Sequence, residues 1–279
     1  MRKTMEICAL ALLALLWAVS PAFQQGPTTR YVNKTDPTCG GHTPCYTTLQ
    51  AAVDAVQPGE TILIQAGVYD APLSIKGKNN SSTATETNRI LIAADPAAPV
   101  GSVVLRGTKQ NGAPGDAIVL EASKFITLRG LTITNAGRAI VLAGGNKKQN
   151  DAIHIERNRI FGNGNSQCRS GILVRAGNIA TLIINNLIYG NGRDGLRFSP
   201  GSGGTHAVVN NTIHGNNHDG VRIGKGPDVV MVNNLITGNG AGTLCPAADE
   251  DTEEGDPDEK NAPDGFGIKR KAPGQPEQV

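Results

Sequence analysis

The sequence Asn158–Arg–Ile–Phe–Gly–Asn163 is the first of four hexapeptides built on one pattern, and this pattern decides the fold. The others are Asn186–Leu–Ile–Tyr–Gly–Asn191, Asn211–Thr–Ile–His–Gly–Asn216 and Asn234–Leu–Ile–Thr–Gly–Asn239. From copy to copy the first asparagine advances by 28, 25 and 23 residues. A period of about 20 to 30 residues is typical of stacked-repeat proteins, in which no single repeat can bury its apolar face alone.

Each repeat contains three short apolar runs in which β-branched or aromatic residues alternate with other residues. The runs of two successive repeats are 181–184, 187–188 and 196–198, followed by 207–209, 212–213 and 221–223. Such alternation predicts short strands with one buried face. Three strands in about 25 residues leave no room for a helix, which excludes a leucine-rich repeat and predicts one coil of a parallel β-helix.

The asparagine columns have a structural explanation. Asparagine tolerates the left-handed backbone conformation, and its side chain can bond both its own turn and the asparagine of the next coil. We therefore expect an internal amide ladder of Asn158, Asn186, Asn211 and Asn234, with Leu131 in the same column of an earlier, degraded repeat. The alternative is four ligand-binding asparagines. Strand-like runs from 61 to 239 predict an all-β solenoid of about seven coils.

The N-terminal residues 1–22 have the pattern of a secretory signal peptide. Arg2 and Lys3 precede an apolar stretch, 9–17, which is too short to span a membrane, and small residues at 20–22 provide a cleavage site. An uncleaved anchor is the alternative. Export predicts a secreted or cell-surface protein in an oxidising environment.

Four cysteines remain beyond this segment. Cys39 and Cys45 are close in sequence and predict a disulfide, since zinc would need further ligands and only His42 is nearby. Cys168 and Cys245 lie about three coils apart, roughly 14 Å along the axis, whereas a disulfide needs Cα atoms within about 7 Å. Their pairing is left open.

The two ends of the predicted β-helix domain, residues 23–245, differ in character. Near the first strand, a short amphipathic helix is expected from a capping threonine to Pro58–Gly59, where it would cover the open end of the solenoid. After the domain, residues 246–279 hold ten acidic and four basic residues and almost no apolar ones. This tail is predicted to be disordered, and its acidic run departs from the calcium-binding EF-hand pattern.

The segment from Cys45 to Tyr69 resembles the entry segment of the right-handed parallel β-helix proteins, the pectin-lyase-like superfamily. It contains Leu49–Gln–Ala–Ala–Val53 and Gly59–Glu–Thr–Ile–Leu–Ile–Gln–Ala–Gly–Val–Tyr69. The Asn–Asn–x–Ile–x–Gly–Asn units resemble the generic repeat of that group, and the likeness covers about residues 31–240. It implies the fold, but not one activity, because the superfamily includes pectate lyases, polygalacturonases, alginate epimerases and adhesins.

Alignment of the repeats places Arg193–Phe198 over His218–Ile223. If alternate residues are buried, Arg197 and Arg222 point outward from one exposed sheet face on adjacent coils, where two cations repel unless an anion bridges them. The resemblance implies glycan binding across that face. The candidate glycan-binding residues are Arg197, Arg222, His218 and Lys225.

Other interpretations apply to the same residues. The resemblance implies, for lyases, a basic residue that abstracts a proton and carboxylates that hold calcium, so Asp194 and Asp219 are candidate metal ligands and calcium is the one candidate cofactor. Alternatively, the two Asp–Gly pairs are turn devices and His218 is a surface or turn residue. No pair of carboxylates has the spacing of a glycosidase acid and base, and the catalytic residues stay unknown.

The distribution of charge favours a polyanionic ligand. The chain carries +2, the tail −6 and the signal segment +1, which leaves +7 on the body. A basic body suits an acidic polysaccharide such as a polyuronate. The sequence therefore predicts a secreted β-helix that binds, and in one version cleaves or epimerises, such a polymer. The alternative is a non-catalytic surface or adhesive module. Nucleic acid is excluded as a partner by export and by the lack of interleaved basic and aromatic residues.

Overall fold

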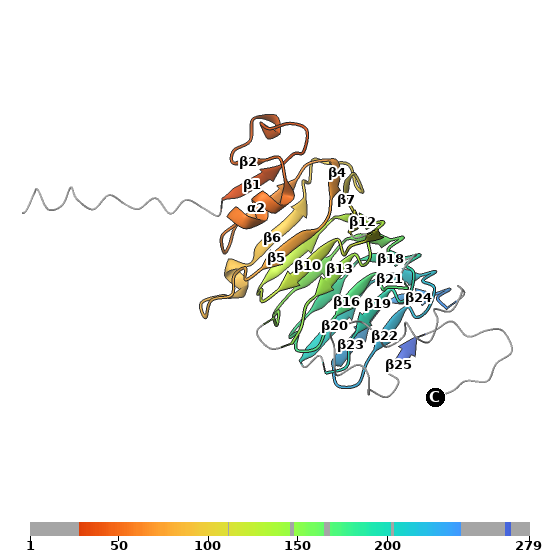
Figure 1. Ribbon diagram of the computed structural model, residues 1–279. Helices are drawn as coiled ribbons and strands as arrows, with labels where there is room; N and C mark the ends of the chain where they lie inside the picture. The colour runs from red at the N-terminus through yellow and green to blue at the C-terminus, as the bar shows by residue number, and fades with distance from the viewer. Residues whose placement is uncertain are drawn as a thin grey trace, which may run out of the picture.

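The computed structural model describes residues 28–110, 112–145, 148–164, 168–201, 204–240 and 266–268. The predicted signal peptide and Cys245 lie outside the described residues, as does the predicted tail apart from 266–268. Within the described part of the chain, no helix is long and apolar enough to cross a membrane. Figure 1 shows one elongated stack of strands, with the N-terminal elements at one end and the last strands at the other.

Three parallel sheets run along the stack, and each coil contributes one strand to each sheet. Sheet A contains β1 Thr29–Val32, β2 Cys45–Tyr46, β3 Thr61–Ile64, β6 Ile90–Ala94, β11 Ile126–Arg129, β14 His154–Glu156, β17 Leu182–Ile184, β20 Thr205–Val209 and β23 Asp228–Val232. Sheet B contains seven strands: β4 Gly67–Asp70, β7 Val103–Arg106, β12 Thr132–Thr134, β15 Arg159–Phe161, β18 Leu187–Tyr189, β21 Thr212–His214 and β24 Leu235–Thr237.

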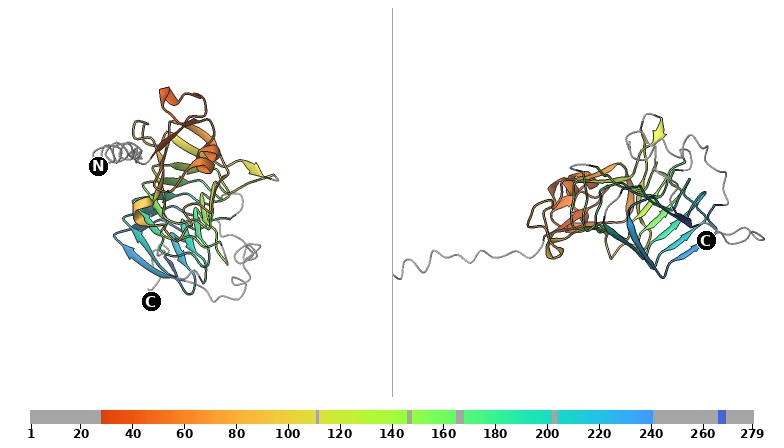
Figure 2. Two further views of the ribbon diagram at one scale, coloured as in Figure 1. Left: turned by 90° about the vertical axis from the view of Figure 1, so that its left-hand side faces the viewer. Right: turned by 90° about the horizontal axis from the view of Figure 1, so that it is seen from below.

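Sheet C is the third face of the solenoid. It contains β5 Leu73–Lys76, β10 Ile118–Glu121, β13 Ile140–Leu142, β16 Ile172–Val174, β19 Leu196–Phe198, β22 Val221–Ile223 and β25 Phe266–Ile268. All neighbouring strands of this sheet are parallel except β25, which is antiparallel to β22. Outside the three sheets, β8 Lys109–Gln110 and β9 Ala113–Pro114 form a hairpin, and η1 Cys39–Gly41 and η2 Glu86–Asn88 are short 3₁₀ turns. Figure 2 shows the sheets meeting at corners along the stack.

The core consists mostly of branched aliphatic side chains in register from coil to coil. In β15, Arg159 is exposed and Ile160 is fully buried. Ile188 and Ile213 occupy the same position in the next two coils and continue this column in the core. This confirms the period-two pattern and the predicted parallel β-helix, because each short strand buries one face against the other two sheets.

The asparagine ladder forms as predicted. Asn158 donates its backbone N–H to Oδ1 of Asn186 at 2.9 Å, and Asn186 and Asn211 repeat the bond to the next asparagine, ending at Asn234. The backbone N–H of Leu131 bonds Oδ1 of Asn158 at 2.9 Å, which confirms its place in the column. Asn158 and Asn186 also donate from Nδ2 to the carbonyls of Leu128 and Ile155, so each side chain satisfies both an N–H and a C=O of the buried turn in the preceding coil.

One detail of this turn differs from the prediction. The left-handed residue is the one before each ladder asparagine, with φ of 54° at Arg157, 58° at Asn185, 54° at Asn210 and 53° at Asn233. The ladder asparagine instead directs its side chain inward, and the preceding residue makes the bend. Two further ladders run inside the stack: Asn163, Asn191, Asn216 and Asn239 form one, and Asn150 and Asn178 form the other.

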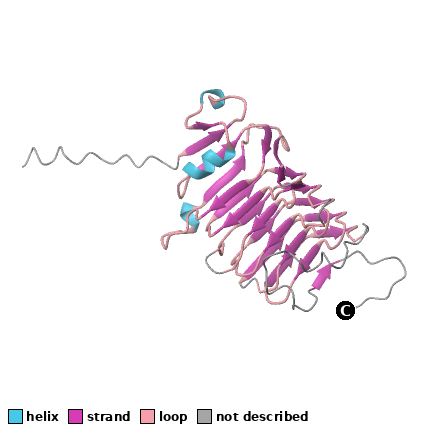
Figure 3. Ribbon diagram, in the orientation of Figure 1, coloured by secondary structure: helices cyan, strands magenta, loops and turns pink. Residues whose placement is uncertain are grey.

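The N-terminal end is covered by a helix and two added strands. Helix α2, Leu49–Ala55, begins after Thr48, whose hydroxyl accepts the Ala51 N–H, and it buries Leu49, Ala52 and Val53 against the first coil. It is the only α-helix in the described residues, and Figure 3 shows it at that end of the stack. Strand β1 pairs with β3 and extends sheet A by one strand beyond the first coil.

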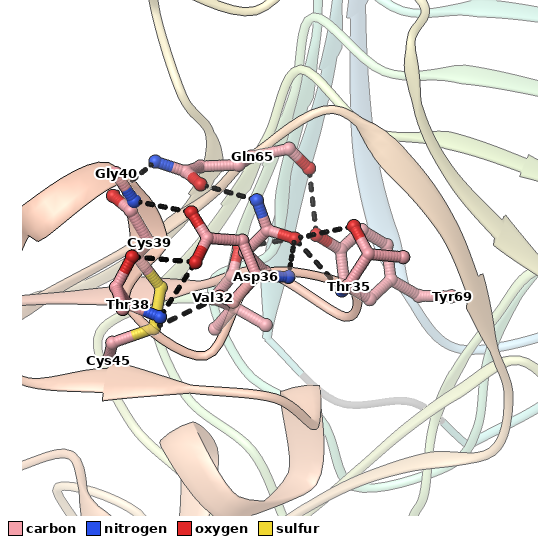
Figure 4. The surroundings of a disulfide bond; sticks show 10 residues. Val32, Thr35, Asp36, Thr38, Cys39, Gly40, Cys45, Gln65 and Tyr69 are labelled. Carbon is pink, nitrogen blue, oxygen red and sulfur yellow. Dashed lines mark hydrogen bonds between the residues drawn. A yellow bond between two sulfur atoms is a disulfide. The ribbon is translucent and has the colours of Figure 1, made fainter.

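The predicted disulfide is present between Cys39 and Cys45, with an S–S distance of 2.03 Å. Figure 4 shows Asp36 beside this loop, where it accepts hydrogen bonds from the backbone N–H groups of Thr38 and Gly40. Cys168 is also disulfide-bonded. The open question of its pairing with Cys245 lies outside the described residues.

Candidate functional site

Charged side chains follow the corner at which the chain enters sheet C. The residue two positions before each of five successive strands, β10 to β22, is polar: these residues are Asp116, Arg138, Ser170, Asp194 and Asp219. The residue before each of them is Gly115, Gly137, Arg169, Arg193 or His218. Since the coils stack in register, these two columns form a continuous polar corner.

Asp194 is the centre of this corner. It is fully buried, and its Oδ1 accepts the backbone N–H of Asp219 and lies 3.1 Å from Nδ1 of His218. Its Oδ2 accepts the hydroxyl of Ser170 at 3.2 Å and lies 3.8 Å from Nε of Arg193. Residues of three successive coils therefore hold one carboxylate.

His218 joins the carboxylates of two coils. Its Nδ1 lies 3.1 Å from Oδ1 of Asp194 and 3.2 Å from Oδ2 of Asp219, and the side chain is buried. The hydrogen bond to Asp194, followed by that to Asp219, raises the pKa of His218 to about 9. His218 is therefore a protonated donor at neutral pH and cannot serve there as a general base.

The carboxylate of Asp194 is ionised in this setting. Burial by itself would raise its pKa, but the hydrogen bond from His218 and the positive charges of Arg193 and Arg197 lower the pKa below its usual value. Two carboxylates, one imidazolium and three guanidinium groups thus meet at this corner. We call these six residues the corner cluster: Arg193, Asp194, Arg197, His218, Asp219 and Arg222. Its formal charge is +2 with His218 protonated.

The register predicted for the two arginines is confirmed, but their exposure is not. Arg197 of β19 pairs with Arg222 of β22, and Leu196 and Phe198 on either side of Arg197 are buried in the core. Arg197 is only 4% exposed, so it does not lie on an open face. Nη1 of Arg222 lies 3.9 Å from Oδ2 of Asp219, so a carboxylate stands close to this cation. The expectation of two mutually repelling surface charges was wrong because it left out the corner carboxylates.

The other predicted site residues have different outcomes. His218, treated as an isolated surface or turn residue in one interpretation, is instead buried between two carboxylates. Lys225 lies exposed in the loop after β22, where its carbonyl accepts the Gly201 N–H. Arg193 and Ser170 were missed. Alignment of Arg169–Ser–Gly–Ile with Arg193–Asp–Gly–Leu and His218–Asp–Gly–Val would have found them, since all three precede a sheet C strand.

The donor set of the corner cluster does not fit calcium. One ligand atom each of Asp194, His218 and Asp219 lie within 4.8 Å of one another, which is close enough to surround an ion. Calcium takes about six to eight oxygen ligands, however, and here the two carboxylates share an imidazolium and lie beside arginines. A protonated histidine repels a cation. The predicted calcium ligation by Asp194 and Asp219 is therefore not supported by their surroundings.

Three solved structures share part of this architecture, each at 14% sequence identity. Escherichia coli ybhc matches with a TM-score of 0.43, over 67% of this chain and 56% of its own. A rhamnogalacturonan lyase matches with a TM-score of 0.42, over 80% of this chain and 64% of its own. The pectate lyase Pel9A matches with a TM-score of 0.37, over 79% of this chain and 83% of its own. This chain thus spans little more than half of the first of these proteins.

No curated protein sequence matches the chain. The family described as "Right handed beta helix region" matches residues 97–251, which is more than half of the chain and includes all of the corner cluster. The three parallel sheets and the internal asparagine ladders agree with that description. The chain belongs to the right-handed parallel β-helix family.

Proposed function

We propose that this protein binds an acidic polysaccharide, of the polyuronate class, along the sheet C corner. The observation that carries the proposal is the set of solvent-reaching cations Arg169, Arg222 and Lys225 around the positively charged corner cluster. A polyuronate presents one carboxylate per sugar, so it offers repeated anions to a repeated row of cations. Guanidinium groups bind carboxylates with charge-assisted hydrogen bonds.

The partly exposed Arg222 and Arg169, and the exposed Lys225, make the contacts with the polymer. The side chain of Arg222 is 15% exposed and that of Arg169 is 36% exposed, and Lys225 is exposed in the next loop. The buried Arg193 and Arg197 hold the corner carboxylates in place. The buried arginines therefore fix the positions of the carboxylates, and the cations that reach solvent bind the polymer.

Binding is better supported than cleavage. Proton abstraction beside a uronate carboxylate needs an uncharged base, and His218 is protonated until the pH approaches its pKa of about 9. Its proton is held by the carboxylates of Asp194 and Asp219. The protonated His218 therefore suits anion recognition better than base catalysis at neutral pH.

The test is a binding measurement with a charge-matched control. Arg222→Ala combined with Lys225→Ala should weaken binding to polygalacturonate or alginate by roughly tenfold and reduce its salt dependence. Arg106→Ala combined with Arg129→Ala removes the same charge from exposed positions on sheets B and A, and should leave binding near that of the parent. Absence of binding by the parent, or equal losses in both variants, would exclude this site. Absorbance of unsaturated products, followed in parallel, should not rise.

A second candidate function is a non-catalytic adhesive module. The exposed apolar side chains of the last coil favour it, since Val230, Val232 and Leu235 are each more than half exposed. Both functions suit an extracellular protein, and the Cys39–Cys45 disulfide fits an oxidising compartment. Failure of the parent to bind any acidic or neutral polysaccharide, with its fold intact, would favour the adhesive function.

A further inference from the structure

The N-terminal cover encloses a cavity at the corner between sheets B and C. Helix α2 lies over the first coil, where the side-chain amide of Gln50 exchanges two hydrogen bonds of 2.9 Å with the backbone of Ser74 in β5. Strand β4 is joined to β5 by Ala71 and Pro72 alone. A cavity of about 410 Å³ lies between this short connection and residues 47–50, and all its lining residues are within the described range 28–110. Figure 1 shows α2, β4 and β5 at this end of the stack.

The inner part of this cavity is apolar. Leu49 of α2, Leu73 of β5 and Leu105 of β7 line it, and none of them is more than 7% exposed. Since Leu105 belongs to the next coil, the cavity reaches one coil into the stack. Tyr69 presents its ring, because its hydroxyl donates to the carbonyl of Gln65, which does not line the cavity (Figure 4). These walls suit an apolar body and offer no partner to polar groups of a ligand.

The mouth of the cavity is polar and carries a net positive charge. The carboxylate of Asp70 accepts hydrogen bonds from Nζ of Lys34 at 2.7 Å and from Nη2 of Arg106 at 3.0 Å. The three side chains are between 40% and 53% exposed, and their formal charge is +1. An ammonium has three N–H donors, and among the described residues Lys34 uses two of them, on Asp70 and on the Val68 carbonyl. The third donor can therefore bond an anion.

We propose that this cavity binds a small organic acid with an apolar body and one carboxylate. The body fills the space between the leucines, and the carboxylate lies at the mouth, where it bonds the ammonium of Lys34. The volume lies within the range of about 300–1,000 Å³ that is usual for small-molecule sites. The cavity belongs to the first coils and the corner cluster to the last ones, so this site is separate from the proposed polysaccharide site.

The chemistry of the cavity disfavours three other classes of ligand. A sugar carries hydroxyl groups around its ring, and the apolar walls would leave them without hydrogen bonds. A cation would be repelled by Lys34 and Arg106, which already neutralise Asp70. A neutral apolar molecule would fit the walls but would gain no bond from Lys34, so it should bind more weakly than an acid of the same shape.

The test compares two ligands of one shape by isothermal titration calorimetry of the full chain. Naphthoate and naphthylmethanol share a ring system and differ in charge. The parent should bind one naphthoate per chain, and more tightly than naphthylmethanol. Lys34→Gln should weaken naphthoate binding by about tenfold and leave naphthylmethanol binding nearly unchanged. Thr47→Trp places a large side chain at an exposed position of the lining and should remove both.

The matched control is Lys76→Gln. Lys76 is an exposed lysine of β5 that pairs with Glu121 at 2.9 Å, so the variant removes the same charge from outside the cavity and should bind naphthoate like the parent. The double variant of the polysaccharide test should also keep naphthoate binding. Circular dichroism should be the same for all these proteins. A parent without naphthoate binding would overturn the proposal. So would full binding by Thr47→Trp, equal losses in the two lysine variants, or an equal loss of both ligands in Lys34→Gln.

Discussion

The apolar core of this solenoid is covered by different elements at its two ends. At the N-terminal end, α2 buries Leu49, Ala52 and Val53 over the first coil, and β1 and β2 extend sheet A beyond it. At the other end, the described residues add one strand, β25, at the edge of sheet C, and Met231 and Ile236 are only partly buried. The difference shows that the core of a parallel β-helix can be covered by a helix with added strands at one end and by an added strand at the other.

The largest expected effect comes from placing a charge under the N-terminal cover. Val53 is fully buried, and Val53→Asp should reduce the free energy of unfolding by roughly 3–5 kcal/mol, because the carboxylate has no partner there. Met231→Asp, at the far end, should cost at most about 2 kcal/mol, because water reaches that position. Urea unfolding at low protein concentration measures both. Equal losses would show that the two ends are equally closed.

The disulfide fastens the N-terminal cover. Replacing Cys39 and Cys45 together by serine should lower stability by about 2 kcal/mol, since the closed loop is short and the unfolded chain gains the lost freedom. Amide hydrogen exchange should then increase in β1 and β2 before it increases in β23. An increase spread evenly over the stack would contradict a role confined to this end.

The asparagine ladder should matter less where it ends. The backbone N–H of Asn211 bonds Asn234 and would be kept by a leucine, whereas the Asn211 side chain bonds the preceding coil. Asn211→Leu should cost roughly 1–3 kcal/mol because the buried Asn186 N–H loses its acceptor and the Ile183 carbonyl loses its donor. The Asn234 side chain makes the same bonds to the Asn211 N–H and the Val208 carbonyl, but it is only half-buried, so Asn234→Leu should cost about 1 kcal/mol less. Thermal unfolding of the pair measures the difference, and an unchanged melting temperature for Asn211→Leu would disprove the ladder's contribution.

Because of two buried histidines, the C-terminal coils should be most stable over a limited pH range. The folded pKa of His218 is about 9, above the ordinary value of about 6.5, so its contribution is complete below pH ~6.5 and is lost as the pH rises through 9. Burial lowers the pKa of His206, so its contribution is present above pH ~6.5 and is lost as the pH falls through the folded pKa. His218→Gln should flatten the alkaline side of a plot of melting temperature against pH. His206→Val should flatten part of the acidic side, where Asp194 also titrates.

His206 also illustrates what the sequence did not reveal. It occupies an apolar core column, where its Nδ1 accepts the Thr181 N–H at 3.3 Å and its ring lies 5.1 Å from that of Phe198. Its Nε2 and the hydroxyl of Thr181 are buried without a hydrogen-bond partner. A histidine in a strand that otherwise alternates gives no local sign of full burial, because only the stacking of neighbouring coils removes it from water.

The repeats predicted which residues of the candidate site are neighbours. The geometry of the turn before sheet C decided how deeply they are buried and which hydrogen bonds they make. Spacing alone gave the register of Arg197 and Arg222, since a strict period brings equivalent positions together in adjacent coils. It did not give their burial or the bonds from His218 to Asp194 and Asp219, because these depend on side-chain directions at a turn. The repeated Asp–Gly pairs suggested that these aspartates only stabilise a turn. In the structure, they also form ion pairs with His218.

The sequence by itself determined the solenoid, the inward faces of its strands, the asparagine ladder and the Cys39–Cys45 bridge. These follow from local periodicity and from short separations, which need no knowledge of the rest of the chain. The tertiary structure alone decided the raised pKa of His218, the burial of Arg197 and the pairing of β25 with β22. Each of these depends on the electric field, the solvent access or the strand edge that distant segments create together, and none of these quantities exists in a single repeat.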